Sequence, residues 1–568
     1  MKKVILSVAF LSNLYFVYAQ TYRINWSEEI KTKKGVGDLN VVTADNTGLY
    51  FTEARMKIKP GFFSATSVQA NYKLYKMNKN FVEIYEKDYA DELRGLEFDS
   101  FQPLGENLYL FATDYQKKGK SFTVYGAKID KNSGNMISGL AEMEKFSLES
   151  KKDEFQMRVS PVKNESSFLV VSNILGKDYV NLRVRLLDKE LKTKQSTAIT
   201  LSFTNEQFTV QDVKLTDDNK IVVLGKEYEE TLVGKKKRKK MIFKSYVMMI
   251  YSSNGNKEKD ILLNSGDRFI ISGKLIEQPG GNLLLAGFYS NSIRKEKLRG
   301  FFINKIDVKT GELTINSFKE INSSMLGAAS LDENEETKTK SKETENPEDD
   351  DDKDQFPNDF IIRSVYVNPS DSSIVINSEV LKRTFYFSTS TYNDGGRRTT
   401  YTTSYDGFIN KDLLIINADK DGNIRWVNAI PKSQREEVVS GVAGPSGSSV
   451  SGYFTGEAGV PYYSSFASLI HNNQLILILN DHTNNKTNTA YGKTVQEIYD
   501  FQKSSSIYGI SIDLATGKMD RKLIAINNGE TIPMPRHALV VQNELFIPSW
   551  KTKKLAKTKV RFAKILVK

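Results

Sequence analysis

Tyrosine and arginine side chains gather in one stretch of this sequence, residues 384–407. Both residue types are enriched where proteins bind one another, because they bury a large area and keep a polar group for hydrogen bonding. Further tyrosines lie in the stretch 436–463. The pattern predicts a binding surface, although a long β-hairpin that uses tyrosine for its strand propensity would have the same composition. The candidate binding residues are Tyr386, Tyr392, Arg397, Arg398, Tyr401, Tyr405, Tyr453, Tyr462 and Tyr463.

The sequence offers little material for catalysis. Cysteine is absent, which excludes disulfides, thiol catalysis and cysteine-ligated metals. The three histidines, His471, His482 and His537, show no metal-ligand spacing, and neither a nucleophile elbow nor a phosphate-binding glycine loop is present. A carboxylate pair for glycoside hydrolysis cannot be picked out among 69 acidic residues. A non-enzymatic role is favoured, and no catalytic residue, metal site or cofactor is identified.

Two further motifs have a structural interpretation beside a functional one. Asn417–Ile424 imitates the start of an EF-hand calcium loop, but its twelfth position is Asn428 where a bidentate glutamate belongs. We interpret it as a hairpin turn. The basic run Lys235–Lys240 lacks interleaved aromatic residues, so no nucleic-acid partner is expected. It is interpreted as a solvated hairpin tip or a contact for acidic lipid headgroups or glycans.

Residues 1–19 have the pattern of an export signal. Two lysines follow Met1, and an apolar run from Val4 to Val17 is too short to span a bilayer. The small residue Ala19 precedes the expected cleavage site. We expect an exported protein that is periplasmic, outer-membrane-associated or secreted. It would have no transmembrane segment, and no cysteine is available for a lipid anchor.

Charge is unevenly distributed along the chain. The formal net charge is +11, yet the stretch from Asp332 to Asp354 holds twelve acidic and four basic residues. Its low complexity predicts an acidic disordered insertion over residues 330–358. The basic remainder would suit an anionic partner, such as an envelope surface or an acidic glycan. General solubility is the simpler explanation.

One strand–turn–strand unit recurs along the chain and predicts its fold. A turn rich in Asn, Asp and Gly leads into a short apolar run, and the first three runs start 59 and 60 residues apart. A second turn, with Asp or Asn before Gly, follows in several units and suits a hairpin. No segment shows a sustained helical period. The apolar runs begin at Leu49, Leu108, Phe168, Ile221, Leu283, Ile374, Leu475 and Leu545.

These units predict an all-β fold, a β-propeller of eight four-stranded blades over residues 20–568, with seven blades as the fallback. The last unit, from about Ile532 to Lys568, holds only three strands. A lone strand from Tyr22 to Ser27 precedes the first unit. We expect this N-terminal strand to pair into the last blade and close the ring.

The long segments fall in connections that share one face of such a propeller. These are the connections from second to third strand and from one blade to the next, because antiparallel strands alternate in direction. Binding residues often lie on loops held by a rigid scaffold, and tolerated surface insertions are the alternative. The long segments are 56–71, 231–240, 330–358, 384–407, 436–463 and 481–506.

One blade turn carries a family resemblance. Ser511–Lys518 resembles the blade motif of the eight-bladed pyrroloquinoline-quinone dehydrogenases, and weaker versions start at Lys128 and Lys305. The resemblance implies blade architecture, while the absence of the family's vicinal cysteines speaks against the quinone enzyme. The Lys-, Asn- and Tyr-rich repeats are also similar to exported propellers of Bacteroidetes. The places of the family's docking tryptophan hold Arg521, Ile315 and Ser138.

The favoured function is that of an exported non-catalytic propeller that binds a protein partner, such as an outer-membrane protein, as a subunit or accessory of envelope or secretion machinery. The alternative is a propeller that binds or cleaves extracellular polysaccharide, using aromatic side chains to stack sugars. A purely structural envelope component is a third possibility.

The favoured function predicts that Arg397→Glu combined with Arg398→Glu abolishes co-purification of a partner, because the change reverses the charge of the candidate surface. The melting temperature should not change. Co-purification that is unaltered by the double substitution would remove this stretch from the binding surface.

Overall fold

The computed structural model describes residues 22–568 apart from several gaps. The predicted signal peptide, the acidic stretch 330–358 and Tyr453 lie outside the described residues. The gaps are 32–35, 60–66, 117, 163–165, 234–237, 264–265, 279–280, 292–297, 323–324, 326–359, 395–396, 444–448, 452–459, 488–492, 528–530 and 552–558.

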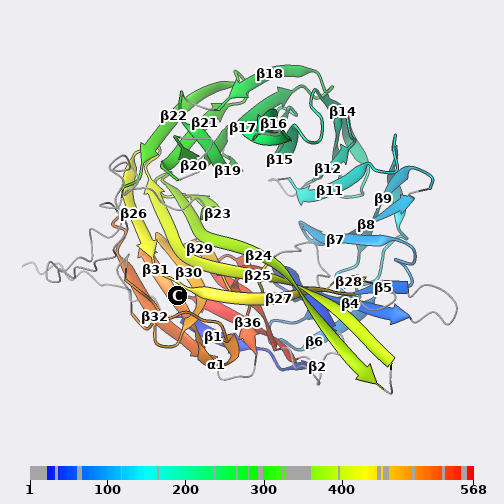
Figure 1. The fold of residues 1–568 in the computed structure, drawn as a ribbon, viewed down its shortest axis with the longest axis vertical. Helices are drawn as coiled ribbons and strands as arrows, with labels where there is room; N and C mark the ends of the chain where they lie inside the picture. Colours follow the sequence, from blue (N-terminus) through cyan, green and yellow to red (C-terminus); the bar gives the residue numbers. More distant parts are fainter. Residues whose placement is uncertain are drawn as a thin grey trace, which may run out of the picture.

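The described chain forms eight antiparallel sheets that follow one another around a ring (Figure 1). This confirms the eight-bladed β-propeller, and the seven-bladed fallback is not needed. Blades one to four contain β3 (Val36–Asp45), β4 (Gly48–Lys59), β5 (Ser67–Met77), β6 (Glu83–Asp88), β7 (Glu97–Leu104), β8 (Asn107–Gln116), β9 (Ser121–Ile129), β10 (Ala141–Ser147), β11 (Glu154–Pro161), β12 (Phe168–Leu175), β13 (Val180–Leu187), β14 (Thr193–Leu201), β15 (Phe208–Leu215), β16 (Ile221–Val233), β17 (Arg238–Tyr251) and β18 (Lys257–Leu262).

The remaining blades follow the same order, with additions in blades six and eight. A single short α-helix, α1 (Phe501–Ser504), lies within the described residues of blade seven. Blades five to eight contain β19 (Phe269–Glu277), β20 (Leu283–Ser290), β21 (Gly300–Asp307), β22 (Glu312–Glu320), β23 (Phe360–Val367), β24 (Ile374–Asp394), β25 (Arg397–Ala418), β26 (Ile424–Ile430), β27 (Gln434–Ala443), β28 (Ser449–Ser451), β29 (Phe466–His471), β30 (Gln474–His482), β31 (Ser505–Asp513), β32 (Met519–Ile526), β33 (Ile532–Pro533), β34 (Leu539–Val541), β35 (Glu544–Lys551) and β36 (Lys559–Val567).

The second strand of each blade supplies much of the core. Each apolar run found in the sequence falls in this strand, and the central ones, such as Leu283–Leu285 in β20, are fully buried. Both faces of a second strand are covered by neighbouring blades, so the side chains read as a continuous apolar run rather than an alternating one. The clusters that result join one blade to the next; one of them joins Leu284 of blade five to Ile376 of blade six.

The turns between third and fourth strands repeat one geometry. Asp513 accepts a hydrogen bond from the backbone N–H of Ala515 at 3.0 Å, and Gly517 adopts a positive φ of 74°. The stretch that imitates a calcium loop is the equivalent turn between β25 and β26, where Asp419 accepts from the N–H of Asp421 at 2.9 Å. The hairpin interpretation of this motif is therefore confirmed.

In blades two, four, five, six and seven, a glycine of this turn lies against the outer strand of the preceding blade. The ring N–H of Trp426, on the fourth strand of blade six, donates to the carbonyl of Leu514 in the turn of blade seven at 3.0 Å. A Cβ at Gly517 would lie 2.8 Å from the Trp426 ring. Glycine is required here both for its positive φ and for the close approach of the indole.

The N-terminal strand closes the ring as predicted. β1 (Tyr22–Trp26) is antiparallel to β36, with Tyr22 opposite Val567 and Trp26 opposite Ala563. It occupies the outermost position of blade eight, which β2 (Ile30–Lys31) extends. Since the two ends of the described chain share one sheet, ring closure depends on hydrogen bonds between residues far apart in sequence.

The antiparallel order places the connections between second and third strands on one face, as expected. Residues 384–407 were expected to form a loop. In the structure the described part of this range, 384–394 and 397–407, belongs instead to β24 and β25, which pair from Leu381 to Asp394. Alternating Thr, Ser, Tyr and Phe favour strand here. Residues 235–237 of the basic run lie outside the described residues. Arg238, Lys239 and Lys240 begin β17, where Lys239 pairs with Glu230 of β16 at 2.9 Å.

Gly517→Ala should lower the free energy of unfolding by at least about 1–2 kcal/mol, the cost of a left-handed conformation for a residue with a Cβ. The clash with Trp426 adds to this cost. Chemical denaturation measures the effect. Gly139→Ala is the control, because no positive φ is found there and nothing lies within 4 Å of the added Cβ. Equal effects of the two substitutions would contradict the docking role of this turn.

Candidate functional site

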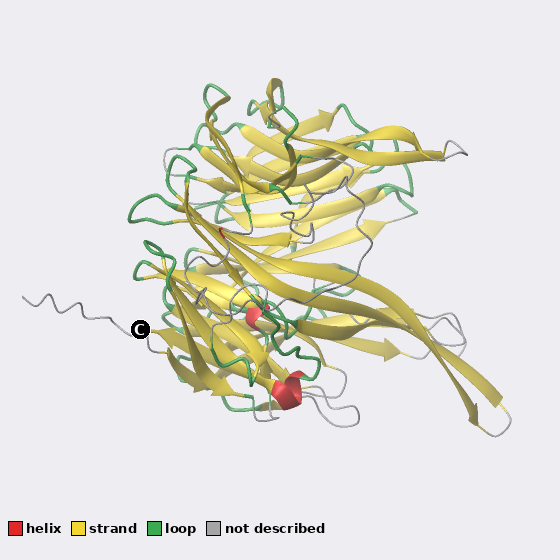
Figure 2. Ribbon diagram, turned by 60° about the vertical axis from the view of Figure 1, so that its left-hand side comes forward, coloured by secondary structure: helices red, strands yellow, loops and turns green. Residues whose placement is uncertain are grey.

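A long hairpin formed by β24 and β25 leaves blade six and projects from the ring (Figures 1 and 2). β23 pairs with β24 only as far as Val380, whereas β24 and β25 stay paired to Asp394. β27 pairs with β25 from Asn410 to Thr402 and adds a third strand. We call residues 381–410 of this hairpin, together with β27, the arm.

The arm carries aromatic side chains on both faces. Phe385 and Phe387 lie on one face with their rings 4.8 Å apart in an edge-to-face arrangement. They are 57% and 65% exposed, respectively. On the other face Tyr386 stacks on Tyr405, at 5.1 Å between ring centres. Partial burial and a hydrogen bond to Glu437 raise the pKa of Tyr386.

The predicted residues are thus only partly brought together. Tyr386 and Tyr405 form one contact. Four others lie farther along the arm, where Tyr392 is opposite Thr399 in the backbone register and Arg398 is opposite Asn393. The side chains of Tyr392, Arg397, Arg398 and Tyr401 lie outside the described part of the structure, as does all of Tyr453.

Tyr462 and Tyr463 lie at the base of the arm and are half-buried. The Tyr462 ring packs edge-on against Trp550 of blade eight at 4.8 Å. The Tyr463 hydroxyl donates to the Trp550 carbonyl at 3.2 Å. Both residues join blades six and eight, so they act as packing residues and do not extend the exposed aromatic surface.

A buried ion-pair network fixes the base of the arm. Glu379 of β24 has no exposed side-chain area, and its carboxylate accepts from the ammonium of Lys432 at 2.9 Å. Arg363 of β23 lies 3.3 Å from the other carboxylate oxygen. Ser465 donates its hydroxyl to the same oxygen. Burial would raise the pKa of Glu379, but Lys432 and Arg363 outweigh it, so the pKa is lowered.

The first residue of β27 extends this network into blade seven. The amide oxygen of Gln434 accepts from Lys432 at 3.0 Å and from the backbone N–H of Ser465 at 2.8 Å. Its amide nitrogen donates to the carbonyl of Asn480 at 2.6 Å. Ser465 has a φ of 75°, an uncommon conformation for a non-glycine residue, and these hydrogen bonds hold it there.

A second buried carboxylate ties the arm to the connection that follows it. Glu436 accepts from the backbone N–H groups of Tyr462, Tyr463 and Ser464 at 2.7, 2.9 and 2.9 Å. Burial is the largest influence and raises the pKa of Glu436, which these hydrogen bonds only partly oppose. β27 is therefore held at its base by backbone donors that precede β29.

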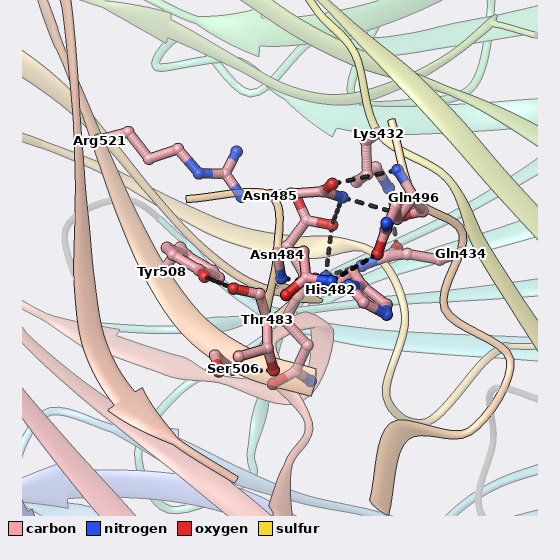
Figure 3. A network of polar contacts seen from close by, with 12 residues as sticks. Lys432, Gln434, His482, Thr483, Asn484, Asn485, Gln496, Ser506, Tyr508 and Arg521 are labelled. Carbon is pink, nitrogen blue, oxygen red and sulfur yellow. Dashed lines mark hydrogen bonds and ion pairs between the residues drawn. The ribbon is translucent and has the colours of Figure 1, made fainter. Parts of the chain in front are cut away.

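The connection from β30 to β31 is anchored by polar contacts of its own (Figure 3). Arg521 donates to the buried carboxylate of Asp481 at 2.5 Å, and its guanidinium lies 4.4 Å from the centre of the Tyr508 ring. Asn485 donates to the other oxygen of Asp481 and to the carbonyl of Gln496, at 2.9 Å each. Through Asn485, these contacts join the two described pieces of this connection, which lie on either side of the gap 488–492.

Other possible sites lie away from the arm. A cavity of about 610 Å³ lies between residues 28–30, which follow β1, and blade one. Glu28, Phe81 and Glu83 are among the residues that line it. An ion pair between Lys73 and Glu86 occupies its wall. Within the described ranges, no group of His, Asp and Glu is arranged to hold a metal ion. In the same part of the chain, no helix is long and apolar enough to cross a membrane.

Comparison with known proteins gives distant likeness in fold only. No protein-family model matches the chain, and no curated protein matches it. The β-propeller domain of the Trilobed protease from Pyrococcus furiosus is 7% identical, with 69% of this chain and 98% of that chain covered and a TM-score of 0.29. A protein of unknown function from Bacteroides caccae is 8% identical, with 63% and 89% covered and a TM-score of 0.26.

Another solved structure covers more of the chain. Cobalt-substituted apocarotenoid oxygenase from Synechocystis is 10% identical over 91% of this chain and 94% of that chain, with a TM-score of 0.35. At such identities and scores, none of these structures informs the activity of this chain.

Sequence reasoning missed the two phenylalanines of the arm and the network at its base. The alternation Phe385-Tyr386-Phe387 is the signal that could have found the former, because a strand presents residues i and i+2 on one face. The Glu379–Lys432 pair gave no such signal, since 53 residues separate its members and only the fold brings them together.

Glu379→Gln should lower the free energy of unfolding at neutral pH by about 3–5 kcal/mol, because it leaves the buried Lys432 without its carboxylate partner. The folded-state pKa of Glu379 is lowered, so its contribution is complete above a pH of about 4.3 and is lost as pH falls through the lowered value. The difference from wild type should therefore narrow below a pH of about 4.3.

Denaturant unfolding between neutral and acidic pH measures this difference. Glu106→Gln, at an exposed turn residue, is the control and should have little effect at any pH. A Glu379→Gln difference that stays constant down to acidic pH would show that the carboxylate charge does not stabilise the arm.

Proposed function

We propose that this protein is an exported, non-catalytic propeller that binds a protein partner of the bacterial envelope through its arm. The observation that carries the proposal is the exposure of Phe385 and Phe387 on an extended strand whose base is held by buried charges. Exposed aromatic residues on a rigid support are typical of protein interfaces, because little conformational entropy is lost when they are covered.

The outer edge of β24 indicates how the partner binds. In the described part of the chain, the segment Leu381–Asp394 pairs with β25 on one side only. An open strand edge presents backbone donors and acceptors that can pair with an extended segment of another protein. Phe385 and Phe387 would then pack against side chains of the added strand.

Charge favours an acidic partner segment. Lys382 lies on the exposed part of β24, and Arg397 and Arg398 begin β25 at the far end of the hairpin. The whole chain carries a net charge of +11. Opposite charges would accelerate the encounter and help to select the partner. Export rests on the signal-like pattern of residues 1–19.

Phe385→Ser combined with Phe387→Ser should reduce recovery of the partner at least tenfold, because it removes the apolar surface of the arm. The measurement is a pull-down with the tagged full-length chain from detergent-solubilised envelopes of the native host, followed by quantitative proteomics. The melting temperature should stay close to that of wild type, since both side chains are exposed.

Leu262→Ser combined with Leu523→Ser is the matched control, because it removes two exposed apolar side chains from outer strands of blades four and seven. A partner lost in both double variants, or in neither, would contradict binding through the arm. If the purified chain is recovered alone and instead binds polysaccharide, the protein-binding proposal is wrong.

A further inference from the structure

Positively charged side chains gather on the inner strands of blades three to six. Figure 1 shows β11, β15, β19 and β23 around the centre of the ring, with β14, β18, β22 and β26 at its rim. These four inner strands carry Arg158, Lys214, Lys274 and Arg363, respectively. Because the strands belong to successive blades, the ring itself brings the four cations together.

One carboxylate serves two of these cations. Asp212 of β15 accepts from the Arg158 guanidinium at 2.6 Å and lies 3.7 Å from the Lys214 ammonium. Lys274 donates to the backbone carbonyl of Arg363 at 3.2 Å, and no described carboxylate pairs with it. Arg363 itself shares Glu379 with Lys432. Positive charge therefore exceeds negative charge at this place.

The excess of positive charge changes the pKa of Lys274. Lys274 is exposed as a residue, yet neighbouring groups partly desolvate its ammonium. This partial desolvation lowers the pKa of Lys274, and the charges of Arg363, Lys214 and Arg158 add to the effect while Asp212 opposes it. A group of like charges held this closely costs stability unless an anion joins it.

Three of these inner strands are irregular near the charged side chains. β-bulges interrupt β15 between Val210 and Asp212, β19 between Ile270 and Ser272, and β23 between Ile362 and Ser364. Each bulge lies beside one of the charged groups, and bulges change the direction in which side chains point. The hydroxyl of Ser272, two residues before Lys274 on the same strand, is buried without a hydrogen-bond partner.

We infer that Arg158, Lys214, Lys274 and Arg363 form a binding site for an oxyanion group, the phosphate or carboxylate of a small ligand, on the inner strands of the ring. Arginine and lysine are the side chains that bind such groups most strongly, through charge-assisted hydrogen bonds. The site lies on blades three to six and does not include the aromatic residues of the arm, so it does not depend on the proposed protein binding.

Isothermal titration of the full-length chain with inorganic phosphate, and separately with malonate, tests the inference at constant ionic strength in sodium chloride. At least one of the two anions should bind, and the tighter one identifies the source of the oxyanion. Lys274→Met should weaken that binding about tenfold or more, the effect of losing a hydrogen bond to a charged group. Arg158→Gln should weaken it as well.

Lys309→Met is the matched control, because it removes one positive charge from an exposed turn of the same blade. It should leave the dissociation constant within about twofold of the wild-type value. In chloride alone, Lys274→Met should raise the melting temperature, since it relieves repulsion between like charges. Absence of binding by the wild-type chain, or equal weakening by Lys274→Met and Lys309→Met, would overturn the inference.

Discussion

The position of the arm depends on one carboxylate that has no contact with solvent. Glu379 lies where β24 leaves the blade, and its charge is stable there only because Lys432, Arg363 and Ser465 surround it. These partners come from β23 and from the segments that precede β27 and β29. A tilt of the arm would separate them and leave a buried charge unpaired, so the network holds the exposed aromatic residues in a fixed place relative to the ring.

The ring supplies the frame for this network by repeating one contact. In five of the blades, a glycine in the turn between the third and fourth strands lies against the outer strand of the preceding blade. Gly517 lies against Trp426 in this way, and Gly422 lies against Ser317. Closure through β1 and β36 joins the two ends of the described chain. Because blades six, seven and eight are fixed to one another, Tyr463 can reach Trp550 and Gln434 can reach Asn480.

Local patterns made the architecture predictable from the sequence. Apolar runs of the kind seen at Leu475–Ile478, bounded by turn residues, marked the second strands, and the unpaired run from Tyr22 marked the closing strand. The candidate binding site was harder to predict from the sequence, because tyrosine is common both in strands and in binding surfaces. Tyr386 and Tyr405 lie on the exposed arm, whereas Tyr462 and Tyr463 pack between blades. Contacts such as Glu379–Lys432 or Arg158–Asp212 join distant segments and leave no local pattern to detect.

Photo-crosslinking in the native host tests most directly whether the arm is a binding surface. A photoreactive amino acid is placed at Phe387, which is 65% exposed on the arm, and at Leu262, which is 73% exposed on an outer strand. We predict a single major adduct of defined mass from position 387, with one protein identified in it by mass spectrometry, and no such adduct from position 262. The same adducts from both positions, or none from position 387, would contradict the account.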